Sequence, residues 1–569
     1  MKKLTLFILF FNIFFAFPQG NTAVTSPYPT DYFINPLEIP LILSGTFGEL
    51  RPNHFHAGID FKTQQKEGFN VLAAAKGYVS RIKISHWGYG KAIYITHPNG
   101  YTTVYAHLQK FNNQIETYLK KQQYKKEKFE IELFPKANEL PISKAEIIAL
   151  SGSTGGYAGP HLHFEIRNSK QEILNPMLFG IKVEDSKKPR INKLLGYSLS
   201  ENSHINGIQP PSEISYKKLE NGDFVADKIN AFGNIGFGIN VYDQLDNATN
   251  KNGIYSLELF VNGVLKHKFI ADISSFSEGK YINLLIDYER YATLKQTIHK
   301  TYTEPLNKLN MYPVSVNNGY ITIENGLDYT IDIVAKDFKG NSQKITIPVV
   351  GKKDSHIVTA PIYLTPYKIT HSEFQKFTKE GVTVAFPKYT FYKDFYLDFQ
   401  VNGGVVKVHT PTIALHKNYT LTFDVSKYSE AEKEKLYIAS ISKKGSSSYK
   451  TTVKKETTFY TSTKTLGNFT LKTDEVSPKV SLHNFSNNQW LTYAKTLQVK
   501  ISDKDSGIKS YRGEIDGEWI LMEYNVKTGL LTYNLNDKKF TKAKHEIKVI
   551  VIDNVGNTTT LNATFFRKK

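Results

Sequence analysis

The chain has 569 residues, several times the ~150 residues of an ordinary domain, so its length predicts several domains rather than one core. It contains no cysteine, which excludes disulfides, thiolate metal sites and a lipid anchor on an N-terminal cysteine. Aromatic residues make up 13% of the chain, with 35 Tyr and 36 Phe, and this enrichment predicts a mainly β protein.

The first 20 residues have the pattern of a signal peptide. Lys2 and Lys3 precede an apolar run from Leu4 to Phe17, and Pro18 follows it. The run of about 14 residues is shorter than the ~20 that span a bilayer, and an uncleaved N-terminal anchor is the alternative. We therefore expect export through the inner membrane to the periplasm, the extracellular space or the cell envelope.

The formal net charge of +19 has two interpretations. It favours binding to polyanions, which for an exported chain are wall polymers and outer-leaflet phosphates, an anionic envelope surface rather than nucleic acid. Dispersed lysines that keep a β protein soluble explain the charge equally well.

Residues 21–188 are predicted to form the first domain, because they hold nearly all of the His-rich and Gly-rich segments. Three of these segments contain paired or isolated histidines: HFHAGIDF (54–61), YTTVYAHL (101–108) and GPHLHFEIR (159–167). Before them, LEIPLILSG (37–45) is interpreted as a first strand, although a latency segment within residues 22–43 is the alternative. The segments between 51 and 167 are the candidate site.

Side-chain periodicity predicts which residues of these segments share a face. His56 and Asp60 are four residues apart, and Gly58 between them favours a strand or a tight bend. In the third segment His161, His163 and Glu165 point to one side of a strand, so two imidazoles face the same cleft. Glu165 is expected to orient a ligand imidazole.

The middle segment is predicted to be the return strand of a hairpin. Asn99-Gly100 separates KAIYITH from YTTVYAH, which indicates a two-residue type I′ turn with positive φ at both positions. On the return strand Tyr101, Thr103, Tyr105 and His107 are expected to share one face, from which the His107 imidazole projects into a neighbouring groove.

Other features of the domain are assigned simpler roles. The glycine-rich stretch 151–160 lacks the Gly-Lys-Ser/Thr ending of a phosphate loop, and we interpret it as a tight turn before His161. The insertion 112–136 is expected to form a short helix beside the groove. Residues that match no ligand position are assigned to packing, turns or the groove wall: His54, His86, Trp87 and His97.

Together the three segments predict one metal site. A catalytic zinc takes about three protein ligands and leaves a position for water, and two histidines with one carboxylate satisfy this need. Imidazole-rich segments do not suggest the oxygen cages that hard cations prefer.

The order H-x-G-x-D, Y-A-H-L, S-T-G-x-x-x-G-P-H-L-H-F-E-x-R resembles the lysostaphin/LytM-type zinc metallopeptidases over about 120 residues. The resemblance implies an antiparallel β-sheet groove with one Zn²⁺ on its floor. It also implies that His56, Asp60 and His163 are metal ligands and that His107 and His161 are catalytic, without deciding which is the general base. The implied activity is hydrolysis of peptide cross-links in peptidoglycan.

Two other functions remain open. In the first, the groove binds wall or a partner enzyme without catalysis, as a scaffold or activator of another cell-wall hydrolase. In the second, the same site cuts other secreted proteins. Because all five site residues are present, the sequence favours the peptidoglycan endopeptidase.

The rest of the chain is predicted to form Ig-like β-sandwich modules at 189–351 and 476–569, with a β-rich module at 352–475. Two paired-glycine segments repeat with the same spacing, from Gly253 to Gly263 and from Gly507 to Gly517. Each copy later has a D-x-x-G-N turn, at 337–341 and at 553–557. A charged stretch, 429–436, is predicted to be helical. No catalytic residues are expected here, and spacing, wall binding or partner contact is the expected role.

Overall fold

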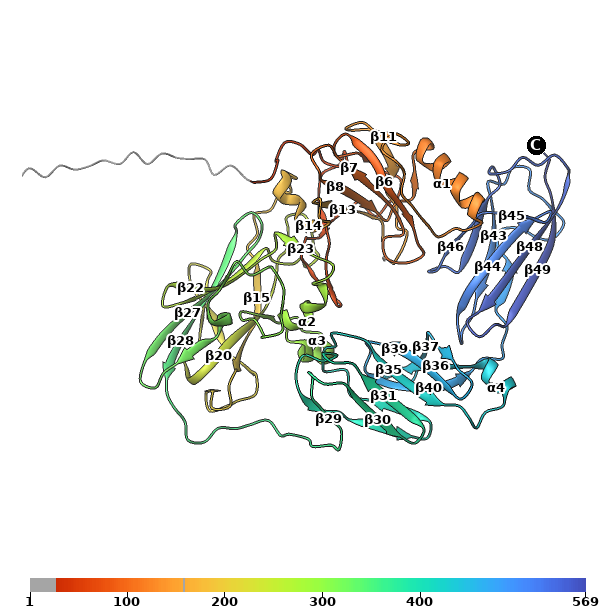
Figure 1. Ribbon diagram of the computed structural model, residues 1–569. Helices are drawn as coiled ribbons and strands as arrows, with labels where there is room; N and C mark the ends of the chain where they lie inside the picture. The colour runs from red at the N-terminus through yellow and green to blue at the C-terminus, as the bar shows by residue number, and fades with distance from the viewer. Residues whose placement is uncertain (1–26, 157–158, 569) are drawn as a thin grey trace, which may run out of the picture.

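The computed structural model describes residues 27–156 and 159–568. As predicted, the protein is mainly β, with an antiparallel N-terminal domain followed by β-sandwich modules. The modules follow one another around a closed circuit, and the C-terminal module returns beside the N-terminal one (Figure 1). The predicted signal peptide, residues 1–20, lies outside the described residues. Among the described residues, no helix has the length and apolar character needed to cross a bilayer.

An antiparallel sheet forms the centre of the N-terminal domain. Its strands lie in the order β1-β4-β13-β8-β7-β6-β10. Their bounds are β1 Leu43–Gly45, β4 Ile59–Lys62, β13 His161–Arg167, β8 Thr102–Ala106, β7 Lys91–Thr96, β6 Gly77–Ile84 and β10 Ile131–Leu133. The strand β13 therefore lies between β4 and β8, although the three are far apart in the sequence. This order places the three predicted histidine segments side by side.

The hairpin between β7 and β8 forms as predicted, but its turn is of a different type. The amide of His97 donates to the carbonyl of Tyr101 (2.9 Å), and that of Gly100 donates to His97 (3.0 Å). Gly100 has a φ of 85°, whereas Asn99 keeps a negative φ, so the predicted type I′ turn is wrong. Pro98 restricts φ to about −65° and favours a type I turn, which Gly100 closes in the left-handed conformation.

The predicted insertion forms a helix, α1 (Asn113–Lys126). The Asn112 side chain accepts a hydrogen bond from the amide of Ile115 and caps the N-terminus. Ile115 and Leu119 are buried against the domain, whose small second sheet has the order β5-β12-β9 (Asn70–Leu72, Ile147–Leu150, Lys110–Phe111). The outer surface of α1 faces the C-terminal module in Figure 1.

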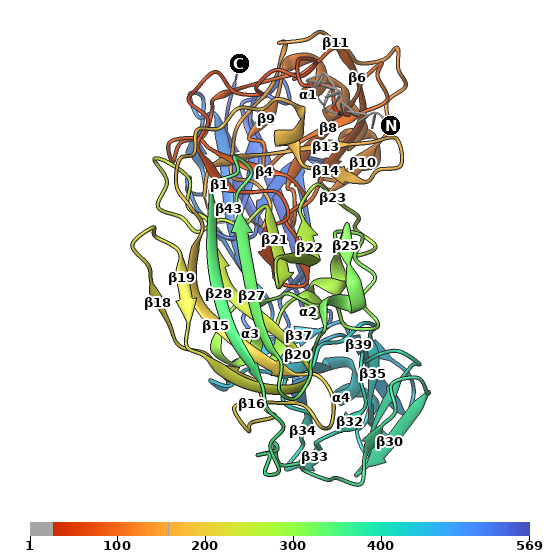
Figure 2. The ribbon, with the colours of Figure 1, turned by 90° about the vertical axis from the view of Figure 1, so that its left-hand side faces the viewer.

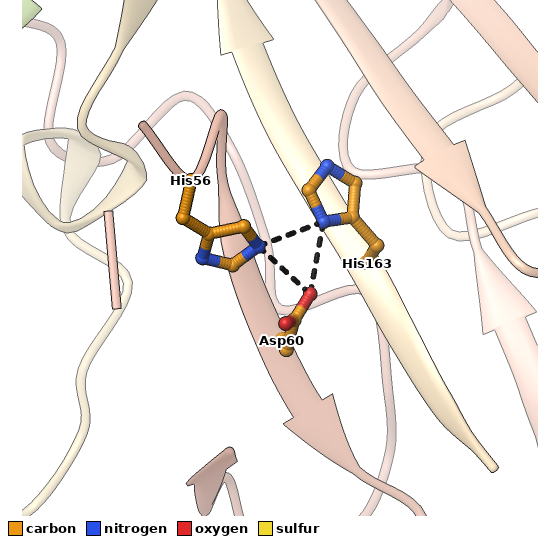
Figure 3. Close-up of side chains that lie close together, drawn as sticks. All are labelled: His56, Asp60 and His163. Atoms are coloured by element: carbon orange, nitrogen blue, oxygen red, sulfur yellow. Dashed lines mark hydrogen bonds and ion pairs between the residues drawn. The ribbon is translucent and has the colours of Figure 1, made fainter. Parts of the chain in front are cut away.

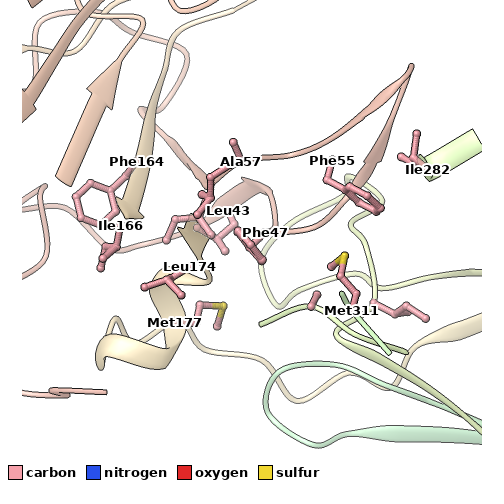
Figure 4. Close-up of a cluster of buried hydrophobic side chains, with 14 of the residues drawn as sticks. Leu43, Phe47, Phe55, Ala57, Phe164, Ile166, Leu174, Met177, Ile282 and Met311 are labelled. Carbon is pink, nitrogen blue, oxygen red and sulfur yellow. The ribbon is translucent and has the colours of Figure 1, made fainter. Parts of the chain in front are cut away.

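The first β-sandwich module shares one hydrophobic core with the N-terminal domain. The short strand β14 (Ile173–Leu174) of the first domain pairs with β23 (Ile273–Ser274) of the module. Figure 4 shows Leu43, Phe47 and Leu174 of the N-terminal domain gathered with Ile282 and Met311 of the module. The two parts are therefore packed as one body rather than joined by a free linker.

Long strands form the body of this module (Figure 2). They are β15 Arg190–Ser198, β20 Ile229–Tyr242, β21 Ser256–Val261, β22 Val264–Ile270, β27 Asp328–Lys336 and β28 Ser342–Gly351. Two short helices, α2 (Ile282–Leu285) and α3 (Tyr288–Leu294), follow β23.

Two further sandwiches complete the chain, each with its own core. The first has sheets β30-β31-β35-β39-β38 (Gln375–Lys379, Val382–Phe386, Tyr419–Asp424, Thr458–Thr463, Val453–Lys454) and β33-β34-β40-β36-β37 (Phe399–Asn402, Val405–Val408, Gly467–Thr473, Leu436–Ile441, Ser447–Lys450). The predicted helix is α4 (Glu430–Lys435), capped by Ser429. The second has sheets β41-β43-β47-β46 (Lys479–Leu482, Thr496–Ser502, Leu530–Asn534, Met522–Asn525) and β42-β49-β48-β44-β45 (Gln489–Trp490, Thr558–Phe566, Lys544–Asp553, Ile508–Ile515, Glu518–Trp519).

Ion pairs close the circuit between the C-terminal module and the N-terminal domain. The ammonium of Lys91 lies 2.8 Å from the carboxylate of Glu523, and that of Lys120 on α1 lies 2.7 Å from Asp537. A cluster of rings, in which His86 contacts Tyr511 and Tyr524, lies beside them. His86 therefore has a packing role, as predicted.

Truncation of Phe164 is expected to destabilise the N-terminal domain. Its ring is fully buried between Phe61 and Tyr105. Phe164→Ala leaves a cavity and should lower the free energy of unfolding by about 3–5 kcal/mol. Hydrogen exchange of the β4, β8 and β13 amides measures this loss. The matched control is Phe374→Ala, whose side chain is 59% exposed and should change stability by less than about 0.5 kcal/mol. Equal losses in the two variants would contradict the assigned core.

Candidate metal centre and active site

Three side chains of the N-terminal domain converge on one point (Figure 3). His56 Nε2 lies 3.0 Å from Asp60 Oδ1 and 3.1 Å from His163 Nδ1. His163 Nδ1 lies 2.9 Å from the same Asp60 oxygen. These three atoms are the ligand set that the resemblance implied, and we call the group the His56–Asp60–His163 triad.

Strand pairing and a bend position the triad. Asp60 on β4 lies directly opposite His163 on β13, so both side chains project from the same face of the sheet. His56 precedes β4, and the chain bends at Ala57-Gly58 to bring its ring back over Asp60. A Cβ at Gly58 would lie 2.2 Å from the carbonyl oxygen of Phe164, so the bend requires glycine.

The outer nitrogen of each triad imidazole has a partner that determines its tautomer. His56 Nδ1 lies 2.8 Å from the carbonyl oxygen of Thr46, and His163 Nε2 lies 2.9 Å from Glu165 Oε1. Because both partners only accept hydrogen bonds, these nitrogens carry the hydrogens. The inner nitrogens then present lone pairs to the carboxylate of Asp60. Three acceptors within 3.1 Å of one another fit a cation, and two imidazoles with one carboxylate suit zinc.

The pKa values of the triad residues also indicate that a positive charge is favoured at the centre of the triad. Burial opposes the charge on His163, but the carboxylates of Asp60 and Glu165 raise its pKa to about 9. Burial alone would raise the pKa of Asp60, but His56 and His163 hold it well below its usual range. The triad thus holds either a proton or a metal ion at its centre, and metal binding releases the proton.

Glu165 is itself held by neighbours that the sequence analysis did not assign. Its Oε2 accepts hydrogen bonds from Arg167 Nε (2.7 Å) and pairs with Arg167 Nη2 (2.6 Å). Its Oε1 accepts from the hydroxyl of Tyr89 as well as from His163. Burial would raise the pKa of Glu165, but Arg167 and His163 lower it to about 2. The period of two along β13 placed Arg167 on the same face, whereas no local signal identified Tyr89.

Arg51 is a further residue that the sequence analysis missed. Its Nη2 donates to Asp60 Oδ2 at 3.0 Å, which orients the carboxylate so that Oδ1 faces the two imidazoles. Gly45 on β1 lies opposite Asp60, and a Cβ there would lie 2.6 Å from Arg51 Nη2 and 2.7 Å from Asp60 Oδ2. The pair therefore depends on the close approach of β1.

His107 and His161 lie beside the triad, as predicted. Their ring centroids are 4.7 Å apart, and His161 Nε2 lies 3.7 Å from Asp60 Oδ1. Each Nδ1 lies 2.9 Å from a backbone carbonyl, that of Thr154 for His107 and that of Gly159 for His161. In both neutral rings Nδ1 therefore carries the hydrogen and Nε2 is the basic nitrogen.

His107 reaches the site by a different route from the predicted one. It was expected to share a face with Tyr105, but the ring of Tyr105 lies in the core and its hydroxyl accepts from the amide of Ala74 (2.8 Å). Strand β8 ends at Ala106, and His107 has a φ of 60°. This left-handed conformation, uncommon for a residue other than glycine, turns the imidazole to the triad side of the sheet. Burial and repulsion from His161 and His163 lower the pKa of His107 to about 3.

The remaining predicted residues lie outside the ligand set. His54 is exposed, and its Nδ1 lies 2.8 Å from the carbonyl oxygen of Pro52. His97 bridges the Lys76 carbonyl and the Thr103 hydroxyl, both at 2.8 Å, and Trp87 is 65% exposed. The glycine-rich stretch packs against the chain before β7, and its Thr154 Oγ1 accepts from the amide of Lys91 at 3.0 Å. A strand follows this stretch, in agreement with the turn assignment.

The solved structures to which this chain is similar include peptidase domains. The catalytic domain of the antimicrobial peptidase lysostaphin from Staphylococcus simulans is 23% identical, with 25% of this chain and 93% of that chain covered and a TM-score of 0.19. A zinc-containing peptidase from Vibrio cholerae is 22% identical, with 27% of this chain and 40% of that one covered and a TM-score of 0.20.

The curated relatives of this chain include proteins named as peptidases. The "DD-carboxypeptidase/endopeptidase Mpg" of Neisseria meningitidis serogroup B is 34% identical over 160 residues, 28% of this chain and 27% of that protein. An "uncharacterized metalloprotease" of Haemophilus influenzae is 33% identical over 130 residues, 23% of this chain and 21% of that protein. The chain thus matches about a quarter of the length of these relatives.

Two family profiles match separate parts of the chain. The Zu5-like domain matches residues 366–474, which contain the two sheets of the middle sandwich, β30–β40. Peptidase family M23 matches residues 54–124, which begin at the first histidine segment and continue through the second into α1. The N-terminal domain of this chain is an M23-like peptidase domain of the lysostaphin/LytM kind.

Proposed function

We propose that this chain is an exported, zinc-dependent endopeptidase that hydrolyses peptide cross-links of peptidoglycan. The observation that carries the proposal is the convergence of His56 Nε2, Asp60 Oδ1 and His163 Nδ1 within 3.1 Å, with His107 and His161 beside them. Three protein ligands with room for one more are typical of catalytic rather than structural zinc.

The triad would hold the metal. When bound, zinc lowers the pKa of a coordinated water from 15.7 to about 7 and polarises a carbonyl oxygen. Asp60 supplies the negative charge, Arg51 orients its carboxylate, and Thr46 and Glu165 keep the two imidazoles in the required tautomers.

His107 and His161 are proposed to move the protons. Their Nδ1 atoms donate to the Thr154 and Gly159 carbonyls, so each Nε2 accepts a proton without a change of tautomer. Burial lowers the pKa of both rings, which keeps them neutral near pH 7. The His107→Ala and His161→Ala variants described below determine which of the two acts as general base.

Several properties support peptidoglycan as the substrate. The first residues have the pattern of a signal peptide, and the net charge of +19 suits an anionic envelope. The curated relative from Neisseria meningitidis is named as a carboxypeptidase and endopeptidase, and lysostaphin as an antimicrobial peptidase. We therefore propose a periplasmic or envelope location and a wall peptide as partner.

Hydrolysis of the wall is the first expected outcome. Zinc-loaded residues 21–569 should release cross-linked peptides from peptidoglycan, identified by mass spectrometry, and a chelator should stop the release until zinc is restored. His163→Ala should lower the rate at least about 10³-fold, because it removes a ligand. The matched control His54→Ala should keep the wild-type rate, since His54 is exposed and outside the triad. Wall binding without cleavage would favour the scaffold function instead, and cleavage of casein alone would favour a general secreted protease.

Separate loss of the two flanking histidines should spare the metal and impair turnover. His107→Ala and His161→Ala are each expected to bind one equivalent of zinc and to lower kcat by about 10²–10⁴-fold. Zinc content by mass spectrometry and steady-state kinetics on a cross-linked peptide measure the two effects. The dependence of kcat on pH then identifies the general base. It is the histidine whose replacement abolishes the rise of kcat with increasing pH. Loss of zinc from either variant would reassign that histidine as a ligand.

Removal of the Glu165 charge should weaken zinc binding. Glu165→Gln keeps the size of the side chain but leaves His163 Nε2 without a carboxylate acceptor, so zinc affinity should fall about 10–100-fold. Competition with a fluorescent chelator measures the affinity. The control is Glu38→Gln, an exposed glutamate, which should leave affinity unchanged. An unchanged affinity in Glu165→Gln would show that Glu165 does not support the ligand.

A further inference from the structure

Two groups of aspartates lie outside the triad, at matching places in two β-sandwich modules. One consists of Asp185, Asp243 and Asp337, and the other of Asp474, Asp503 and Asp553. In each group one carboxylate oxygen from each residue lies within 4.8 Å of the others. Such proximity of three acids is unexpected in a chain with a net charge of +19.

The two groups are equivalent in the fold. Asp185 and Asp474 lie in the segments that enter the modules, each four residues before a proline, Pro189 or Pro478. Asp243 directly follows β20, and Asp503 directly follows β43. The third member of each group begins a D-x-x-G-N turn that the sequence repeats.

The last residue of that turn ties the group together in both modules. Asn341 Nδ2 donates to Asp337 Oδ2 (2.7 Å) and to the carbonyl of Asp185 (3.2 Å). In the C-terminal module Asn557 Nδ2 donates to Asp553 Oδ2 (2.8 Å) and to the carbonyl of Asp474 (2.9 Å). The same contacts therefore occur in both modules, although the sequences around them differ.

The charges in these groups are not neutralised by the protein. Across residues 27–156 and 159–568, no ion pair joins any of the six aspartates to a lysine, arginine or histidine. The Asp243 side chain is only 3% exposed, and its Oδ1 has no hydrogen-bond partner among these residues. A buried acceptor without a donor, facing two other carboxylates, requires a cation or a proton.

Burial and mutual repulsion act on the first group in the same sense. Burial, with repulsion from Asp185 and Asp337, raises the pKa of Asp243 to about 8. Burial raises the pKa of Asp337 to about 6, with a further contribution from Asp185. Both shifts have one geometric cause, which is the close approach of three carboxylates at a largely buried position.

We propose that each aspartate group binds one calcium ion, which fastens the incoming segment to the end of its β-sandwich. The donors are all oxygens, which excludes a preference for zinc and favours a hard cation. Ca²⁺ takes six to eight oxygen ligands at 2.3–2.6 Å in a flexible geometry, which three carboxylates with one oxygen each within 4.8 Å of the others can begin to supply, whereas Mg²⁺ demands a near-ideal octahedron. Backbone carbonyls and water complete the shell.

Calcium at these positions would stabilise the arrangement of the modules. Asp185 lies between the peptidase domain and the first sandwich. Asp474 lies between the middle sandwich, with β30–β40, and the C-terminal module, which contacts the peptidase domain again (Figure 1). The two ions therefore act on the segments that determine how the modules are oriented. The calcium proposal does not rest on the proposed peptidase activity.

Calorimetry on the whole exported chain tests the proposal. Residues 21–569 are stripped with EDTA, dialysed, loaded with one equivalent of Zn²⁺ to fill the triad, and titrated with CaCl₂. Two equivalents of Ca²⁺ should bind, with a Kd at or below about 10⁻³ M, as in extracellular modules. Asp243→Asn and Asp503→Asn should each remove or weaken one equivalent at least tenfold, and the double variant should bind none. The matched control Asp328→Asn, an exposed aspartate outside the groups, should bind two.

Proteolysis supplies a second readout. Calcium should slow cleavage of the wild type in the segments 182–189 and 472–478, and the double variant should not respond. Should either of these variants fail to fold, Asp185→Asn and Asp474→Asn, in the connecting segments, replace them in both measurements. Absence of calcium binding up to 10 mM (about ten times the expected Kd), or binding that the double variant retains, would overturn the proposal.

Discussion

The chemistry of the N-terminal domain depends on two imidazole lone pairs and one carboxylate oxygen that face the same point. None of the three is free to turn away. The Thr46 carbonyl holds the outer nitrogen of His56, Glu165 holds that of His163, and Arg51 holds the second oxygen of Asp60. Each of these hydrogen bonds can remain when a cation is bound, because it is made by an atom that the cation does not contact. Without a cation the same geometry retains a proton, as the raised pKa of His163 shows.

These restraints extend beyond the peptidase domain. Thr46, whose carbonyl orients His56, accepts a hydrogen bond at its hydroxyl from the amide of Gly253 in the first sandwich (3.1 Å). Asn250 of the same module donates to the carbonyl of Ser44 (3.0 Å). Together with the shared apolar core, these bonds make the first sandwich part of the support for the metal site. The module therefore has a structural role that the sequence did not predict.

The C-terminal module contacts the opposite side of the same domain. Lys527 donates to the carbonyl of Ser153, next to Thr154, whose carbonyl holds His107. Glu523 pairs with Lys91, which is buried beneath the same stretch of chain. The C-terminal module thus contacts the stretch of chain that orients His107.

Local patterns predicted the mainly β fold, the hairpin β7–β8 and the helix in the insertion, whereas the family resemblance implied the five candidate site residues, which the structure brings together. His161, His163 and Glu165 share a face because a strand has a period of two, and this property needs no long-range contact. The turn type failed because Pro98, outside the Asn-Gly pair, changed the preferred conformation. The orientation of His107 failed because its strand ends one residue earlier and its φ is positive.

The sequence by itself determined which residues are the candidates for the site, since motif order and alternation are properties of short segments. Only the tertiary structure decided how they are held. The contacts of Arg51, Tyr89 and Thr46 with the triad join strands and loops that no local pattern relates. The shared core with the first sandwich and the aspartate groups arise in the same way, because each brings together residues tens to more than a hundred positions apart. Such contacts depend on sheet order and packing, which a single sequence does not reveal through its periodicity.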